Sequence, residues 1–306
     1  DDFGQALSQI VEHVRAGLGR VTWSKLRLRL RTILLHLVPA SLYAAGGLLF
    51  WRTCVMGGAG RDQARECMST RERLLLLAAV LTHGAALHAA IFPGVDMRFG
   101  FGVALSLMVW LAVCFYWVET LYTRLEGLHA AIMSAGALAS LFPLFFPGDH
   151  VLANAASPAF RVHFVIAMLA YSLFTLAALH AMLMSVASRQ LHSARFSRLL
   201  AGLPPLLTME ALLFRLISIA FVLLTLTLVT GVLFSETLFG QALRVDHKTV
   251  FAFISWLLFG GLLVGRRLWG WRGRVALRWT LAGFVALMLA YVGSRFVIEV
   301  VLHRAG

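Results

Sequence analysis

Apolar residues are gathered along the chain into eight long runs, separated by shorter polar segments. The runs cover roughly residues 33–51, 74–92, 99–118, 127–146, 162–186, 211–233, 249–265 and 276–300. Each is close to the length of about 20 residues that an α-helix needs to cross a bilayer. Each must be helical, because hydrocarbon cannot satisfy the backbone groups of an open sheet edge. The pattern predicts an all-α polytopic membrane protein, a bundle of eight transmembrane helices.

Residues 1–32 differ in character from the eight runs. Apolar residues recur there at helical spacing, and the cationic stretch KLRLRLR follows at 25–31. The first residue is Asp, so we expect this amphipathic basic arm to be either a surface helix or a product of where the chain was started. The transmembrane domain is then expected over residues 33–304.

Basic residues are shared unevenly between the two sets of loops. The loops after the first, third, fifth and seventh runs carry fourteen: Arg52, Arg61, Arg65, Arg71, Arg73, Arg124, Arg189, Arg195, Arg198, Arg266, Arg267, Arg272, Arg274 and Arg278. The other loops and the C-terminal tail carry five: Arg98, Arg161, Arg244, Lys248 and Arg304. Because basic loops stay in the cytoplasm, both termini are expected outside. The arm's basic residues favour the opposite orientation, but the loop bias repeats four times.

Composition narrows the class of protein. With 60% hydrophobic and 13% charged residues, the chain is no soluble domain. The net charge of +13 does not indicate nucleic acid, because the arginines lie between apolar runs, where membrane proteins keep their loop charges. The three cysteines lack metal-ligand spacing, and no phosphate-binding glycine loop, H-E-x-x-H or G-x-S-x-G occurs. The hydrolase and nucleotidase classes therefore have no support.

The fifth run carries His163 near one end of the apolar stretch 161–184. An imidazole there is costly to leave unpartnered, so it either hydrogen-bonds to a carbonyl or water, or binds a ligand. A stripe of mostly small residues follows it at helical spacing: Ala167, Ala170, Phe174 and Ala177. Such a stripe lets another backbone, or a flat ligand, approach closely.

Several histidines converge on the outer face in the predicted orientation. His163 lies at the head of the fifth helix, His247 at the head of the seventh and His303 beyond the eighth, whereas His83 lies near mid-membrane. Two axial imidazoles from facing helices are what a six-coordinate haem requires. Haem also carries two carboxylates, which Arg295 on the same side could bind. The alternative for Arg295 is an ion pair with a nearby glutamate.

Four segments resemble the membrane part of CcsA/ResC-type cytochrome c assembly proteins. They are RVHFVIAMLAYSLF at 161–174, TLTLVTGVLF at 225–234, DHKTVFAFISWLLF at 246–259 and LAYVGSRFV at 289–297. The resemblance extends over about residues 32–304 and is greatest to the shorter eight-helix branch, which includes HemX-like and YpjD-like inner-membrane proteins.

In the haem-handling members of that family, a tryptophan-rich outer segment ending W-D-P-K-E-T holds haem between two outer histidines, and a further pair lies inside the membrane. The resemblance implies that His163 is the first outer histidine and that His303 stands close to the second. Residues 246–249 match the end of the tryptophan-rich segment, with His247 in place of proline. His83 is the best candidate for an intramembrane histidine.

The chain also departs from the family pattern. LFGQALRVDH at 238–247 lacks tryptophan, and Val264 lies where the family has a histidine near the cytoplasmic helix end. The resemblance therefore implies haem binding without a full haem-export and cytochrome c synthesis role.

We accordingly expect a multi-pass protein of the bacterial inner membrane that binds or handles haem as an accessory to cytochrome c biogenesis, without catalysing a reaction. His163 and His247 are the expected iron ligands, with His303 as the alternative to His247. Expected partners are membrane lipid, haem and other cytochrome c assembly proteins, and not nucleic acid. The alternative function is a structural or regulatory membrane subunit of the same fold that binds no haem.

The topology is testable by cysteine labelling of intact spheroplasts with a membrane-impermeant reagent. Because basic loops stay inside, cysteines introduced within 234–248 should be labelled and those within 187–210 should not. Strong labelling confined to 187–210 would invert the orientation.

Overall fold

The computed structural model describes residues 26–27, 30–52, 70–94, 97–121, 126–147, 152, 155, 157–192, 206–239, 247–293 and 296. Eight helices in these ranges are long and apolar enough to span a membrane, which confirms the predicted all-α fold. The first helix covers Leu30–Phe50. The others are α2 (Thr70–Ile91), α3 (Phe101–Glu119), α4 (Glu126–Phe145), α5 (Pro158–His192), α7 (Leu206–Phe239), α8 (His247–Trp269) and α9 (Arg274–Met288). Most of the predicted arm lies outside the described residues.

Helix boundaries follow local chemistry. Proline opens α5 at Pro158, where a missing backbone N–H costs nothing because the first turn has no intrahelical acceptor for it. A second proline, Pro143, lies buried within the last turn of α4. Near the C-terminus of the chain, α9 continues into a π-helical turn, η3 (Leu289–Gly293). Such turns accommodate one extra residue per helical repeat.

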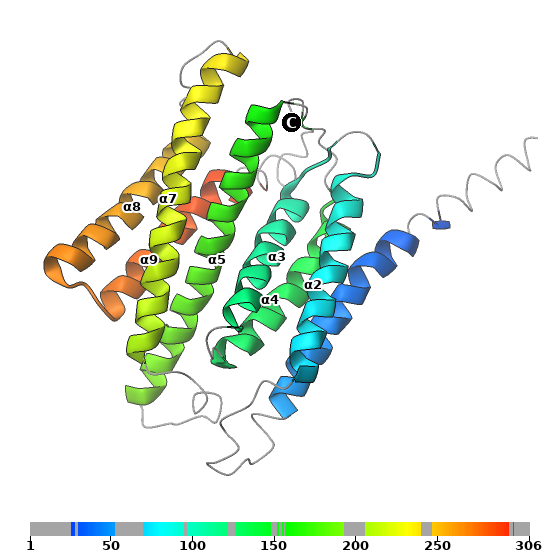
Figure 1. Cartoon of the computed structure of the whole chain (residues 1–306), viewed down its shortest axis with the longest axis horizontal. Coiled ribbons are helices and arrows are strands. Elements are labelled where there is room, and N and C mark those ends of the chain that lie inside the picture. The colour runs from blue at the N-terminus through cyan, green and yellow to red at the C-terminus, as the bar shows by residue number, and fades with distance from the viewer. Residues whose placement is uncertain are drawn as a thin grey trace, which may run out of the picture.

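Helix α5 is the centre of the bundle. It packs against α3, α4, α7 and α9, and Figure 1 shows it between the α2–α3–α4 group and the α7–α8–α9 group. The buried share of its span is 61%, compared with 17% for α7 and 22% for α8, so lipid-facing surface lies mainly on those outer helices. The small residues of α5 explain this central position, because they let neighbouring backbones approach.

Close contacts fix the C-terminal group on α5. The Phe174 ring stacks on Phe259 of α8 with centroids 3.9 Å apart. Ser255 donates a hydrogen bond to the Gly283 carbonyl at 3.0 Å, which joins α8 to α9. The indole N–H of Trp256 donates to Thr225 Oγ1 at 2.9 Å, which joins α8 to α7. The first helix packs on α4, where His36 bonds to the Ser140 carbonyl at 2.9 Å.

A glycine at the start of α3 permits the tightest helix contact. A Cβ added to Gly102 would lie 2.5 Å from the Phe146 carbonyl oxygen and 2.8 Å from that of Phe142. Backbone atoms cannot move aside cheaply, so Gly102→Ala should destabilise the protein by about 1–3 kcal/mol. Gly94→Ala is the matched control, because a Cβ there meets nothing within 4 Å. Thermal unfolding in detergent measures both; equal midpoints would contradict the expectation.

Candidate functional site

The candidate site lies where the head of α5 meets the last third of α7. His163 is half-buried there, and its Nδ1 lies 2.9 Å from Thr230 Oγ1. Of the two alternatives that the sequence left open for this imidazole, the hydrogen bond is present. Its partner, however, is a side-chain hydroxyl of another helix and not a carbonyl.

The hydroxyl of Thr230 determines which ring nitrogen of His163 carries the proton. Thr230 Oγ1 donates to the Leu226 carbonyl at 2.7 Å, with the Thr227 carbonyl at 3.2 Å. We assign the single hydroxyl hydrogen of Thr230 to its shorter contact, the Leu226 carbonyl, so that Thr230 accepts from His163. Nδ1 therefore carries the hydrogen, and the lone pair is on Nε2. Among the described residues, no hydrogen bond engages Nε2.

Two further residues of α7 surround the imidazole. A Cβ added to Gly231 would touch His163 Cε1 at 3.4 Å, so glycine leaves space at the ring edge between the two nitrogens. The ring of Phe234 meets the imidazole edge-on, with centroids 6.4 Å apart and an interplanar angle of 86°. The segment 225–234 is one of those that resemble the family. Nothing in the sequence, however, indicates that Thr230 contacts His163.

The stripe that follows His163 is filled by protein. Ala167 is 8% exposed, and Ala170, Phe174 and Ala177 are fully buried. Of the two readings of this stripe, close approach of neighbouring helices is therefore the one observed. Any ligand of His163 must lie at the end of the helix, beyond Ala167.

The predicted partner residues of His163 have different positions. His247 is exposed and is the first residue of α8. No hydrogen bond or ring contact between described side chains joins His247 to His163. His303 and Arg295 lie outside the described residues, so their roles stay predictions. Arg161 is exposed two residues before His163, and its Nε donates to the Ala155 carbonyl at 2.7 Å.

His83 has a different environment from His163. It is fully buried, with Nε2 2.9 Å from Ser106 Oγ and Nδ1 3.4 Å from the Tyr43 hydroxyl. These contacts tie α2 to α3 and to the first helix. An iron ligand at His83 would have to replace one of these hydrogen bonds.

Two further histidines, His129 and His180, are fully buried and are not among the predicted site residues. His129 on α4 bonds through Nδ1 to the Tyr116 hydroxyl at 3.2 Å, but its Nε2 has no partner among the described residues. Neither ring nitrogen of His180 on α5 has one. α3 and α5 run in the same direction, and Phe99, just before α3, contacts Phe164 of α5. His180 follows Phe164 by about as many residues as Tyr116 follows Phe99, so the two lie at a similar height along the bundle. Both lie within apolar stretches of sequence that contain no motif to indicate a functional role.

Comparison with known proteins identifies a matching family and several similar proteins. Residues 68–302 match the family described as "Cytochrome C assembly protein". The chain is similar to the inner membrane protein YpjD of Escherichia coli K12, 32% identical over 238 residues, 75% of this chain and 88% of that protein. It is 29% identical over 280 residues to a 28.8 kDa protein of Azospirillum brasilense, 89% of this chain and 96% of that protein.

A shorter stretch is similar to the cytochrome c biogenesis protein CcsA of Prochlorococcus marinus MIT 9515, 36% identical over 98 residues, or 32% of this chain and 31% of that protein. No solved structure matches the chain. The family match spans α2 to the C-terminal region, and so includes both helices that form the His163 site. On this evidence, the chain belongs to the cytochrome c assembly protein family, as an eight-span membrane protein.

Proposed function

We propose that this protein binds or handles haem in the bacterial inner membrane, as an accessory to cytochrome c biogenesis, with His163 as an axial ligand of the haem iron. The observation that carries the proposal is the Nδ1–H tautomer of His163, held by Thr230. Metal-bound histidines commonly donate their second ring N–H to a fixed acceptor, which orients the ring and increases its basicity. The lone pair of Nε2 is then available for iron.

The surroundings of His163 suit a flat, apolar group with acidic edges. Gly231 leaves space beside the imidazole, and Phe234 offers an aromatic edge. Haem would supply a redox-active iron and two carboxylates. Arg295 is the predicted partner for a carboxylate. For the second axial ligand we propose His247, at the head of α8, ahead of His303.

The location and partners are proposed on the same basis. YpjD is named as an inner membrane protein, and the sequence similarity supports the same membrane for this chain. Membrane lipid, haem and other cytochrome c assembly proteins are the proposed partners. The protein binds and positions its ligand and does not catalyse a reaction.

The alternative is a structural or regulatory membrane subunit without haem. It is favoured by one observation, namely that the small-residue stripe below His163 is filled by protein. A Soret absorption band in the purified protein separates the two functions, because only the haem-binding function produces it.

Removing the proposed ligand is the direct test. His163→Ala should lose the six-coordinate low-spin spectrum, and added imidazole should restore it by filling the vacated position. His88→Ala, an exposed histidine at the end of α2, is the control and should leave the spectrum unchanged. His247→Ala and His303→Ala, measured in parallel, identify the second ligand. An unchanged spectrum in His163→Ala would refute the ligand assignment, and a wild type without haem would refute the function.

The role of Thr230 can be tested separately. Thr230→Val keeps the side-chain shape but removes the acceptor for Nδ1–H, so the ring is no longer held in one tautomer. We expect haem affinity to fall about 10-fold or more, the usual effect of losing such an outer partner, with a shifted Soret maximum. Thr230→Ser should restore both. Equal haem affinity and spectra in the valine variant and wild type would show that the hydrogen bond does not tune the ligand.

A further inference from the structure

The turn between α8 and α9 concentrates positive charge next to exposed apolar side chains. Its sequence, RRLWGWRGRVALR at 266–278, contains five arginines; we call this segment the arginine hairpin. Residues 247–293 contain no Asp or Glu at all. The charge of the hairpin must therefore be balanced from another helix or from outside the protein.

The backbone of the hairpin is held in one tight conformation. Gly270 and Gly273 have φ of 65° and 56°, a left-handed conformation that costs residues with a Cβ considerably more. The Trp271 N–H donates to the Gly265 carbonyl at 3.2 Å, and a Cβ on Gly265 would overlap the Trp271 ring. That ring also packs against Trp269 and Trp279, at 5.7 and 4.9 Å between centroids. The arginines thus project from a defined scaffold.

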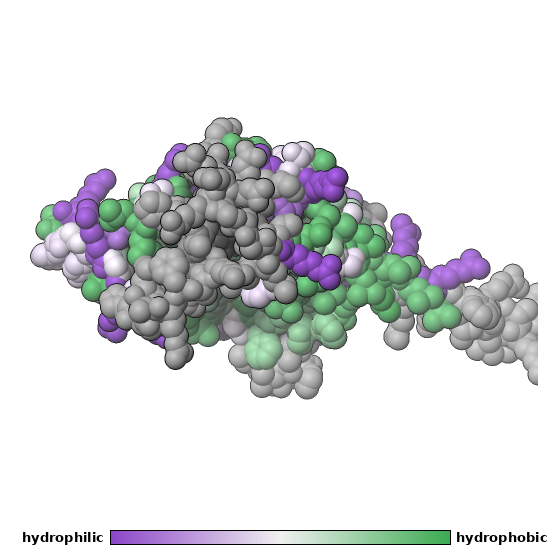
Figure 2. All heavy atoms as spheres, turned by 90° about the horizontal axis from the view of Figure 1, so that it is seen from below, coloured by the Kyte–Doolittle hydropathy of each residue, from purple (hydrophilic) through white to green (hydrophobic). Residues whose placement is uncertain are grey.

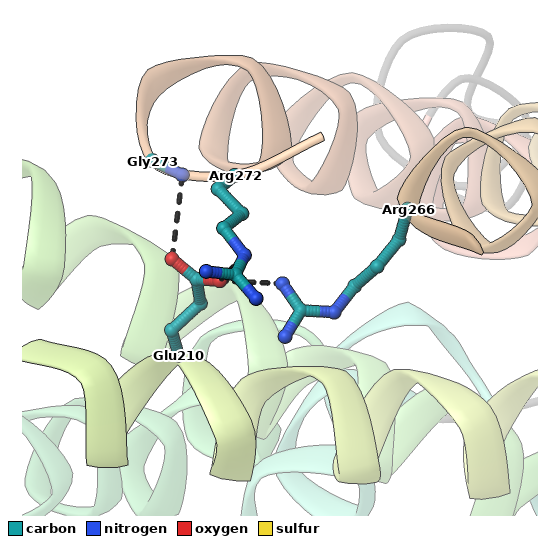
Figure 3. Close-up of polar contacts among 4 residues, drawn as sticks. All are labelled: Glu210, Arg266, Arg272 and Gly273. Atoms are coloured by element: carbon teal, nitrogen blue, oxygen red, sulfur yellow. Dashed lines mark hydrogen bonds and ion pairs between the residues drawn. The ribbon is translucent and has the colours of Figure 1, made fainter. Parts of the chain in front are cut away.

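A single carboxylate from α7 binds the inner side of the hairpin. Glu210 is 8% exposed and forms an ion pair with Arg266. Its carboxylate also lies 3.7 Å from Arg272 Nε and accepts a hydrogen bond from the Gly273 N–H at 3.4 Å, at the start of α9 (Figure 3). The Arg266 guanidinium lies over the Phe214 ring at 3.9 Å. Glu210 therefore offsets part of the inner charge and interacts favourably with the positive end of the α9 dipole.

The outer arginines remain unbalanced within the described residues. Arg267, Arg274 and Arg278 are exposed and take part in none of the described ion pairs. Arg274 and Arg278 are one helical turn apart and so share a face of α9. The second acid of α7, Glu236, belongs to the opposite end of that helix, about 39 Å away along the axis at 1.5 Å per residue.

Apolar side chains are exposed beside these charges. Leu268 is 70% and Trp269 68% exposed. Figure 2, which views the molecule from below, shows hydrophilic side chains gathered at the left, where Figure 1 has the α8–α9 turn. Arginines next to an exposed leucine and tryptophan are typical of the membrane interface, where the apolar groups enter the acyl region and the cations stay at the headgroups.

We propose that the arginine hairpin binds the phosphate of anionic phospholipid headgroups in the leaflet that it faces, through Arg267, Arg274 and Arg278. An anionic lipid supplies the negative charge that the hairpin lacks, whereas the ammonium group of a zwitterionic lipid offsets its own phosphate. Each arginine near an anionic surface contributes about a fivefold preference. The surface selects a lipid and not a soluble anion, because Leu268 and Trp269 need an apolar environment next to the phosphate.

The test uses the full chain in nanodiscs of phosphatidylcholine with increasing phosphatidylglycerol, with native mass spectrometry to count the phosphatidylglycerol retained. Arg267→Gln, Arg274→Gln and Arg278→Gln combined should reduce the preference for phosphatidylglycerol by about fivefold per arginine. This variant leaves Glu210 and its partners intact. The matched control replaces Arg71, Arg73 and Arg189 by Gln, which removes the same charge from exposed positions outside the hairpin. It should reduce the preference less than the hairpin variant does, because the proposal places the bound headgroup at the hairpin.

Three outcomes would overturn the proposal. The wild type could show no preference for phosphatidylglycerol, the two triple variants could lose it equally, or inorganic phosphate in detergent could compete fully for the lipid. Arg274→Gln alone, with a smaller expected loss of about fivefold, decides the matter if the triple variant does not fold. None of these results depends on whether haem is bound.

Discussion

A polar side chain inside the bilayer must find its partner within the protein, because hydrocarbon offers none. Several interhelical hydrogen bonds of this bundle satisfy that requirement. His36 bonds to a carbonyl of α4, His83 bridges α3 and the first helix, and His129 bonds to Tyr116. His163 obeys the same rule near the N-terminal end of α5, where Thr230 is its partner. The hydrogen bond at the proposed ligand site is therefore of the same kind as those that join the other helices.

The requirement also distinguishes His163 from the deeper histidines. Both ring nitrogens of His83 are engaged, so its contribution is to helix association. One nitrogen of His163 is engaged, and the side chain as a whole is only half-buried. Among the described histidines, His180 and the Nε2 of His129 are buried with no hydrogen-bond partner for these ring nitrogens. Buried polar atoms of this kind are rare and costly in folded proteins.

Helix α5 connects these features to the rest of the fold. Its small residues allow both helix groups to pack against it, while its first turns carry Arg161 and His163 to the surface. At the opposite end of α7, Glu210 holds the α8–α9 turn against the bundle. α7 therefore contributes to both polar sites, although most of its length faces lipid.

The sequence by itself determined the eight spans, their boundaries to within a few residues and the family, because a membrane span depends on a length of apolar residues that is local in the chain. It also identified His163 as the histidine with an intact family context. Only the tertiary structure decided what that histidine contacts. Thr230 lies 67 positions away and Glu210 lies 56 positions from Arg266. Such pairs depend on the rotation and register of two helices, and apolar helix sequences encode these only through the packing of all their neighbours.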